Sequence, residues 1–169
     1  LGGGLVFTQQ IVGDLTHKAD SNISFKAGID WRPSENTLIY AGVSRATKAG
    51  GFSSSLDGFL LPSEVPYDPE RLTSYEAGIK TSLFDGLMTM NAGMFYYDYN
   101  DYQAFTFEGL TQKILNLDAE VYGGEIEVIA TPADGLDLLL GISLLEGEAF
   151  DVPLPDGSFS DRPLPQSPS

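Results

Sequence analysis

Residues 72–105 alternate between apolar and polar positions on both sides of the pair Asp85-Gly86. Asp-Gly between two alternating segments indicates a β-hairpin with a two-residue turn. Folding the chain about this turn gives one face of apolar pairs, from Leu83 opposite Met88 to Tyr75 opposite Tyr96. The positions between them pair Ser82 with Thr89, Lys80 with Asn91, Gly78 with Gly93 and Glu76 with Phe95. The hairpin is therefore predicted to have one apolar and one polar face.

The same alternation predicts six strands in three hairpins. These strands are expected at residues 22–31, 37–45, 72–84, 87–105, 118–130 and 136–148. Short turns at residues 32–36, 85–86 and 131–135 close the hairpins. The other connections, residues 47–71, 106–117 and 151–169, are long and rich in Gly, Ser, Pro and Asp. All short turns therefore lie at one edge of an antiparallel sheet, and all long connections lie at the other.

This asymmetry is typical of transmembrane β-barrels, whose strands need about 9 to 11 residues to cross the bilayer. Several of the expected strands are longer than that. Aromatic residues also gather near the strand ends, with Trp31 and Phe84 beside short turns and Tyr96, Tyr97, Tyr99 and Tyr102 toward a long connection. This placement predicts two interfacial girdles, although aromatic residues are also common in strands of any kind.

Composition excludes several classes of protein. A chain of 169 residues with 42% hydrophobic content is long and apolar enough to fold. Its net charge of -15, from 24 acidic and 9 basic residues, argues against nucleic acid as a partner. There is no cysteine for a disulfide or a thiolate metal site, and no apolar run suggests a signal peptide or a spanning helix. The mean hydropathy of -0.05 fits a soluble protein and a membrane barrel equally well.

Three segments carry a family resemblance. Residues 37–52 read TLIYAGVSRATKAGGF, residues 67–80 read YDPERLTSYEAGIK, and residues 116–127 read NLDAEVYGGEIE. In this order they resemble the strand blocks of TonB-dependent outer-membrane receptors. The resemblance runs from about residue 20 to residue 169 and covers most of the chain.

The resemblance implies an all-β, antiparallel, up-and-down transmembrane β-barrel fragment with short periplasmic turns and long extracellular loops. Residues 1–19 are expected to be part of an extracellular loop or strand end, residues 20–151 barrel strands, and residues 152–169 part of another loop. Complete family members have about 22 strands around a plug domain. The plug, the TonB-binding segment and the final aromatic strand have no counterpart here, so we expect an excerpt from the middle to late barrel.

The function implied is uptake across the outer membrane of a Gram-negative bacterium, without enzymatic activity or cofactors. The partners implied are the lipid bilayer, the TonB complex through the plug, and a scarce ligand. An iron-siderophore chelate is favoured, with cobalamin or an oligosaccharide as alternatives. The apolar face would touch lipid, and the polar face would line a plugged lumen through Lys26, Asp30, Glu76, Lys80, Glu125 and Glu127. Reversing the faces would cost about 2 to 4 kcal/mol for each basic residue near the midplane.

Several residues could support catalysis or metal binding, but a structural role explains them more simply. Glu125 and Glu127 share a face and could act as an acid and a base for glycoside hydrolysis, but lumen lining accounts for them. Residues 98–101 offer oxygen ligands for calcium without the spacing of the usual 12-residue loop. His17 is the single histidine, so no histidine triad or cluster can form. Arg45 and Lys48 could meet an anionic chelate or simply face water. No catalytic or metal-binding residue is assigned, and the ligand-binding residues are left open.

Two other classes remain as alternatives. A soluble β-sandwich or jelly roll that binds carbohydrate would cover Ile79, Met90 and Ala92 with a second sheet. A membrane barrel would leave this apolar face bare in the isolated chain. A general porin would share the barrel but lack a plug and a TonB contact.

Overall fold

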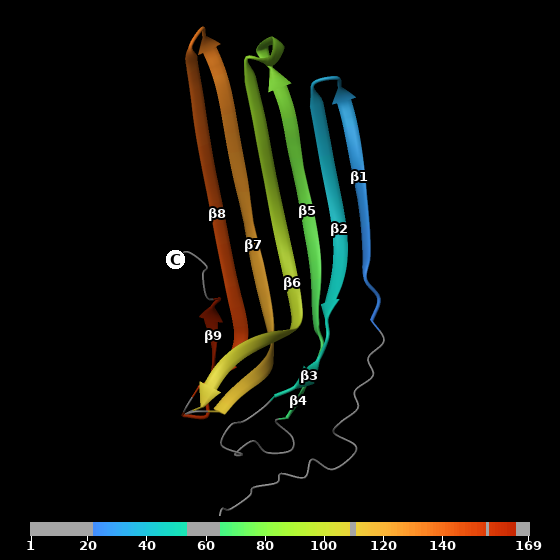
Figure 1. Cartoon of the computed structure of the whole chain (residues 1–169), viewed down its shortest axis with the longest axis vertical. Helices are drawn as coiled ribbons and strands as arrows, with labels where there is room; N and C mark the ends of the chain where they lie inside the picture. Colours follow the sequence, from blue (N-terminus) through green and yellow to red (C-terminus); the bar gives the residue numbers. More distant parts are fainter. Residues whose placement is uncertain (1–21, 54–64, 109–110, 155, 165–169) are drawn as a thin grey trace, which may run out of the picture.

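The computed structural model of the chain describes residues 22–53, 65–108, 111–154 and 156–164. They form a seven-stranded antiparallel sheet in the order β1-β2-β5-β6-β7-β8-β9 and a two-stranded ribbon, β3-β4. Figure 1 shows the long strands side by side, with the short turns together at one end. The bounds of the strands are β1 Phe25–Ser34, β2 Thr37–Lys48, β3 Gly51–Phe52, β4 Pro66–Tyr67, β5 Glu70–Leu83, β6 Met88–Glu108, β7 Thr111–Ala133, β8 Leu136–Pro153 and β9 Phe159–Pro163.

The predicted register of the central hairpin is confirmed. Leu83 pairs with Met88, Tyr75 with Tyr96, and every intermediate pair is the one expected from the Asp-Gly position. The turn itself is wider than the two residues predicted. Phe84–Gly86 form a short 3-10 turn, η3, in which Phe84, Asp85 and Gly86 all have positive φ, at 54°, 55° and 92°. Because the loop widens symmetrically about Asp85-Gly86, the pairing on both sides is unchanged.

The strands extend further than predicted at the end with the long connections. Residues 106–117 were expected to be a loop, but β6 and β7 stay paired as far as Glu108 opposite Thr111. Part of the expected tail, residues 151–169, is also strand, because β8 reaches Pro153 and β9 pairs with it. In these segments apolar and polar residues no longer alternate, but the backbone pairing between the strands continues.

The described residues form a single layer with little interior. The buried hydrophobic residues among them are Val65, Ala119 and Ala149, whereas Met94 is 68% exposed and Leu144 is 74% exposed. The described part of the chain contains no second sheet over the apolar face, which contradicts the sandwich alternative. The sheet is open, with β1 and β9 as its edges. Within the described ranges, no helix has the length and apolar character to cross a membrane.

Candidate functional site

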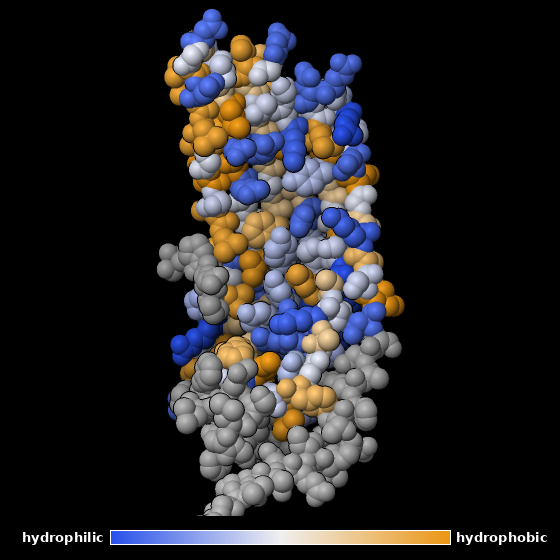
Figure 2. All heavy atoms as spheres, in the orientation of Figure 1, coloured by the Kyte–Doolittle hydropathy of each residue, from blue (hydrophilic) through white to orange (hydrophobic). Residues whose placement is uncertain are grey.

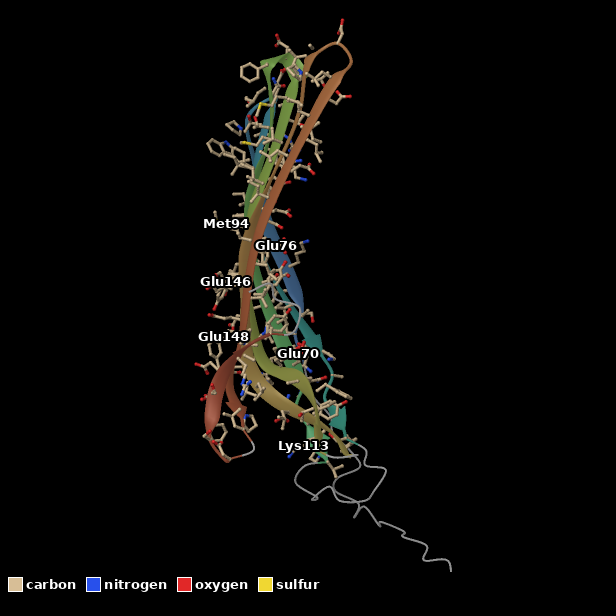
Figure 3. All side chains as sticks on the ribbon, turned by 90° about the vertical axis from the view of Figure 1, so that its left-hand side faces the viewer. Glu70, Glu76, Met94, Lys113, Glu146 and Glu148 are labelled. Atoms are coloured by element: carbon tan, nitrogen blue, oxygen red, sulfur yellow. The ribbon has the colours of Figure 1, made fainter. Side chains whose placement is uncertain are left out.

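Along the same stretch of the strands, the two faces of the sheet carry chemically different residues. One row across β1, β2, β5, β6, β7 and β8 consists of Ile29, Ala41, Ala77, Met94, Gly124 and Leu144. The next row toward the short turns consists of Trp31, Ile39, Ile79, Ala92, Ile126 and Ile142. Both rows lack a charged residue. Figure 3 shows Met94 on this side of the sheet and Glu76 on the other. We call the first side the apolar face and the second side the polar face.

A row of tyrosines ends the apolar face toward the long connections. Tyr75, Tyr96 and Tyr122 are register neighbours across β5, β6 and β7. The Tyr96 hydroxyl donates a hydrogen bond to Glu120 Oε2 at 2.8 Å, and the Tyr122 hydroxyl donates one to Glu146. The hydroxyls of Tyr96 and Tyr122 are therefore held by carboxylates, while the rings of the row border the apolar rows. This amphipathic arrangement is typical of an interfacial aromatic girdle.

The composition of this girdle differs from the prediction. Of the four tyrosines expected there, Tyr96 lies on the apolar face. Tyr97 lies on the polar face, where its hydroxyl donates to Glu76 Oε1 at 3.4 Å. Tyr99 shares that parity, and its ring meets Tyr102 edge to face with centroids 5.6 Å apart. Adjacent strand residues point to opposite faces, so four nearby tyrosines cannot all join one girdle. Tyr75 and Tyr122, which the sequence argument did not place there, complete it.

The height of the apolar face matches a bilayer. From Leu83 beside the η3 turn to Tyr75 in the tyrosine row, β5 spans about 27 Å at roughly 3.4 Å per residue. Outer-membrane barrels carry an apolar band about 25 Å tall between two aromatic girdles. At the turn end of the β5–β6 hairpin, Phe84 is 71% exposed, as expected for the second girdle, whereas Trp31, which is 60% exposed, lies in the same register row as Ile79 and Ile142. The apolar face therefore has the dimensions and the borders of a lipid-facing surface.

The polar face carries the charged residues that were predicted to share it. Register places Lys80, Asn91, Glu127 and Gly141 in one row, and Tyr40, Gly78, Gly93, Glu125 and Ser143 in the next. Asn91 Nδ2 donates to Glu127 Oε1 at 3.2 Å. These two rows line a hollow of about 400 Å³. Figure 2 views the sheet from this side, where hydrophilic residues gather over the middle strands and hydrophobic residues prevail toward β7 and β8.

Aromatic rings cover two glycines of the polar face. A Cβ on Gly78 would lie 2.5 Å from the hydroxyl oxygen of its register partner Tyr40. A Cβ on Gly123 would lie 2.8 Å from the ring of its register partner Phe95. Each glycine leaves the space in which the partner ring lies against the sheet. Because the rings of Tyr40 and Phe95 lie against the sheet over these glycines, they project little from the polar face. The hollow beside Tyr40 therefore stays open.

The other candidate residues have ordinary partners. Asn100 Nδ2 donates to Asp98 Oδ1 at 3.2 Å, and Asp101 forms an ion pair with Arg71 at 3.5 Å. No group of three or more His, Cys, Asp or Glu residues in the described ranges could hold a metal ion. His17 lies outside those ranges.

The two candidate cations for an anionic ligand lie on different faces. Arg45 is in register with Thr73, in the row that continues through Asp98 and Glu120 on the side of the apolar face. Lys48 shares the parity of the polar face and forms an ion pair with Glu70 at 3.8 Å. The two residues therefore cannot act together on one ligand.

Comparison with known proteins agrees with this geometry. The model of the family described as TonB dependent receptor-like, beta-barrel matches residues 3–169. The solved structures that resemble the chain include the alcaligin outer membrane receptor FauA from Bordetella pertussis. That likeness has a TM-score of 0.54 at 12% sequence identity, over 85% of this chain and 24% of that one. The chain thus spans about a quarter of the length of that receptor, and the likeness supports the fold.

Proposed function

This chain belongs to the TonB-dependent receptor β-barrel family, and from that premise we propose that it is part of the barrel wall of an active uptake receptor. The family resides in the outer membrane of Gram-negative bacteria and consists of receptors and transporters, not enzymes. We infer that the complete protein captures a scarce ligand outside the cell and delivers it to the periplasm without chemical change. Residues 20–151 would supply wall strands, and residues 1–19 and 152–169 would belong to the extracellular side.

The observation that carries the proposal is the contrast between the two faces of one unshielded sheet. An apolar face bounded by Tyr75, Tyr96 and Tyr122 suits acyl chains. The opposite face, with Lys80, Glu125 and Glu127, suits water or a hydrated protein surface. Large barrels of this type enclose a plugged lumen. The proposed neighbour of the polar face is therefore the plug, and the proposed partner beyond it is the TonB complex.

An iron-siderophore chelate is the proposed ligand. Supporting it, the similar receptor FauA is by name a receptor for alcaligin. The acidic balance of the chain, 24 acidic against 9 basic residues, gives this wall segment few cations of its own for an anionic chelate. Ligand recognition is therefore expected to depend on parts of the receptor beyond these residues.

Uptake by the complete receptor tests the proposal. The complete receptor would be expressed in cells that lack all other outer-membrane iron receptors, in one strain with and one strain without a functional TonB gene. Both strains would be given radiolabelled ferric chelates. We expect accumulation of at least one chelate that is lost when TonB is absent. Passive, TonB-independent entry of small solutes would favour the porin alternative instead. Uptake of labelled cobalamin or an oligosaccharide, with no chelate transported, would keep the receptor and change the ligand.

A further inference from the structure

The outer halves of β6 and β7 leave the plane of the sheet. Between Tyr99 and Tyr102 the register with β7 shifts, and Asp101 adopts the left-handed conformation at φ 58°. An extra residue of this kind bends the strand that carries it. Beyond the bend, the two strands lean toward the side on which Glu76 and Glu70 lie, and Lys113 lies on this leaning part (Figure 3). We call the described residues 102–108 and 111–117 of this hairpin the leaning arm.

The side chain of Gln103 on the leaning arm joins the two ends of the β2–β5 connection. It is 9% exposed, and its Nε2 donates to the carbonyl oxygen of Ala49 at 2.9 Å and to that of Asp68 at 3.2 Å. Ala49 follows β2, and Asp68 precedes β5. The backbone N–H of Gln103 also donates to Glu70 Oε2 at 2.9 Å. A single residue of β6 therefore holds segments that are 19 positions apart in the chain.

Asn116, the register partner of Gln103 on β7, makes a second set of bonds to the same place. Its Oδ1 accepts from the backbone N–H of Asp68 at 2.7 Å, and its Nδ2 donates to the Asp68 carbonyl oxygen at 3.0 Å. This pair of bonds imitates the pairing of one strand with another. The same Nδ2 donates to the carbonyl oxygen of Asp101 at 2.8 Å, at the bend itself. Asn116 thus links the bend and the connection.

The held segment has its own stiffening contacts. Gly51 pairs with Tyr67 in the β3–β4 ribbon, and a Cβ on Gly51 would lie 2.5 Å from the Tyr67 hydroxyl oxygen. The backbone N–H of Ser53 donates to the carbonyl oxygen of Val65 at 2.6 Å, and Val65 is 6% exposed. The ends of the connection therefore form a small ordered unit, which the two amide side chains fasten to the leaning arm.

We propose that Gln103 and Asn116 are positioning residues that make the leaning arm and the ends of the β2–β5 connection one rigid element at the mouth of the barrel. That this end is the extracellular mouth rests on the function proposed above. The donors are the essential part, because Gln103 Nε2 and Asn116 Nδ2 meet backbone carbonyl oxygens that a carboxylate would repel. The element holds the residues after β2, the residues before β5 and the leaning arm in a fixed relation to one another.

Hydrogen exchange on the complete receptor in lipid nanodiscs tests the coupling without a ligand or TonB. In the unaltered protein, peptides that cover residues 49–53 and 65–70 should exchange slowly. Gln103→Glu keeps the size of the side chain and removes both donations, so exchange in both peptides should rise by about tenfold or more. Asn116→Asp keeps the bond from Asp68 N–H and should give a smaller rise. Asn100→Asp, which loses a donation within its own strand, is the matched control and should change neither peptide.

A distance measurement provides the second readout. Spin labels at the exposed positions Phe52 and Asp134 report the ribbon relative to the short β7–β8 turn. We expect a narrow distance distribution in the parent protein and a broad one with Gln103→Glu. Fast exchange of residues 65–70 in the unaltered receptor would overturn the proposal, even if the variants did not fold. An unchanged distribution in Gln103→Glu, or equal effects of Asn100→Asp, would overturn it as well. Failure of the transport assay would leave these outcomes unaffected.

Discussion

The phenol ring of Tyr40 occupies the space that a side chain at Gly78 would need, on the neighbouring strand and directly opposite in register. A Cβ at Gly78 would also lie 2.6 Å from the carbonyl oxygen of Ala92, on the strand beyond. The position is closed by a ring on one side and by backbone on the other. The pair is a fixed feature of the polar face and allows a direct test of the sheet.

Gly78→Ala should destabilise the barrel by about 1 to 3 kcal/mol, because the new methyl group must displace Tyr40 or the backbone. Urea unfolding of the complete receptor in lipid vesicles measures this change. Gly141→Ala is the matched control, since a Cβ on Gly141 meets nothing within 4 Å. Equal stability of both variants would contradict the close contact between Tyr40 and Gly78.

A charge on the apolar face should be costly, whereas a charge one residue away should be tolerated. Ile142 lies in the central apolar row of β8, and Ser143 points to the polar face. Ile142→Arg should lower the free energy of unfolding in lipid by about 2 to 4 kcal/mol, because arginine near the bilayer midplane is poorly solvated. Ser143→Arg should change it by less than about 1 kcal/mol. The same vesicle assay compares the two variants, and a larger penalty at Ser143 would reverse the assigned faces.

The corrected girdle predicts different environments for two tyrosines. In a Trp31→Phe background, tryptophan would replace either Tyr122 on the apolar face or Tyr97 on the polar face. Brominated lipids should quench the fluorescence of Tyr122→Trp strongly, because its ring borders the acyl chains. They should leave Tyr97→Trp nearly unquenched, because its ring lies behind the sheet. Equal quenching of the two tryptophans would show that the girdle is assigned incorrectly.

The chain by itself should not behave as a soluble domain. In the part of the chain that the structure describes, the sheet has two unpaired edges, at β1 and β9, and an uncovered apolar face on which Leu144 is 74% exposed. Expressed alone without detergent, the 169-residue chain should aggregate or fail to melt cooperatively. Size-exclusion chromatography and thermal denaturation provide the check. A monodisperse monomer with one sharp transition would argue against a barrel wall.

The register of the hairpins could be predicted from sequence because it depends on local information. Asp85-Gly86 fixes the centre of the turn, and the contrast between Ile79 and Lys80 tells which neighbours share a face. The outer extension of β6 and β7 could not be predicted, because beyond the membrane both faces meet water and alternation disappears. To assign tyrosines to the girdle, one must know to which face of the sheet each residue points. The neighbours Tyr96 and Tyr97 point to opposite faces.

The contacts of Gln103 and Asn116 were outside the reach of sequence patterns for a different reason. Gln103 Nε2 donates to the backbone of Ala49 and Asp68, 54 and 35 positions away, and backbone carbonyls carry no sequence signal. An amide in a strand is equally consistent with exposure to water. The folded register was needed to show that both amides of one cross-strand pair meet the same connection.

Solvent accessibility along β5 and β6 tests the central claim most directly. Single spin labels at residues 76, 77, 79, 80 and 91–95 of the complete receptor in bilayers would be relaxed by oxygen, which concentrates in lipid, and by a water-soluble nickel chelate. At positions 77, 79, 92 and 94 we expect high oxygen and low nickel accessibility. Positions 76, 80, 91, 93 and 95 should show low oxygen accessibility. High oxygen accessibility at this second set, or no alternation at all, would contradict a lipid-facing Met94 and an inward-facing Lys80.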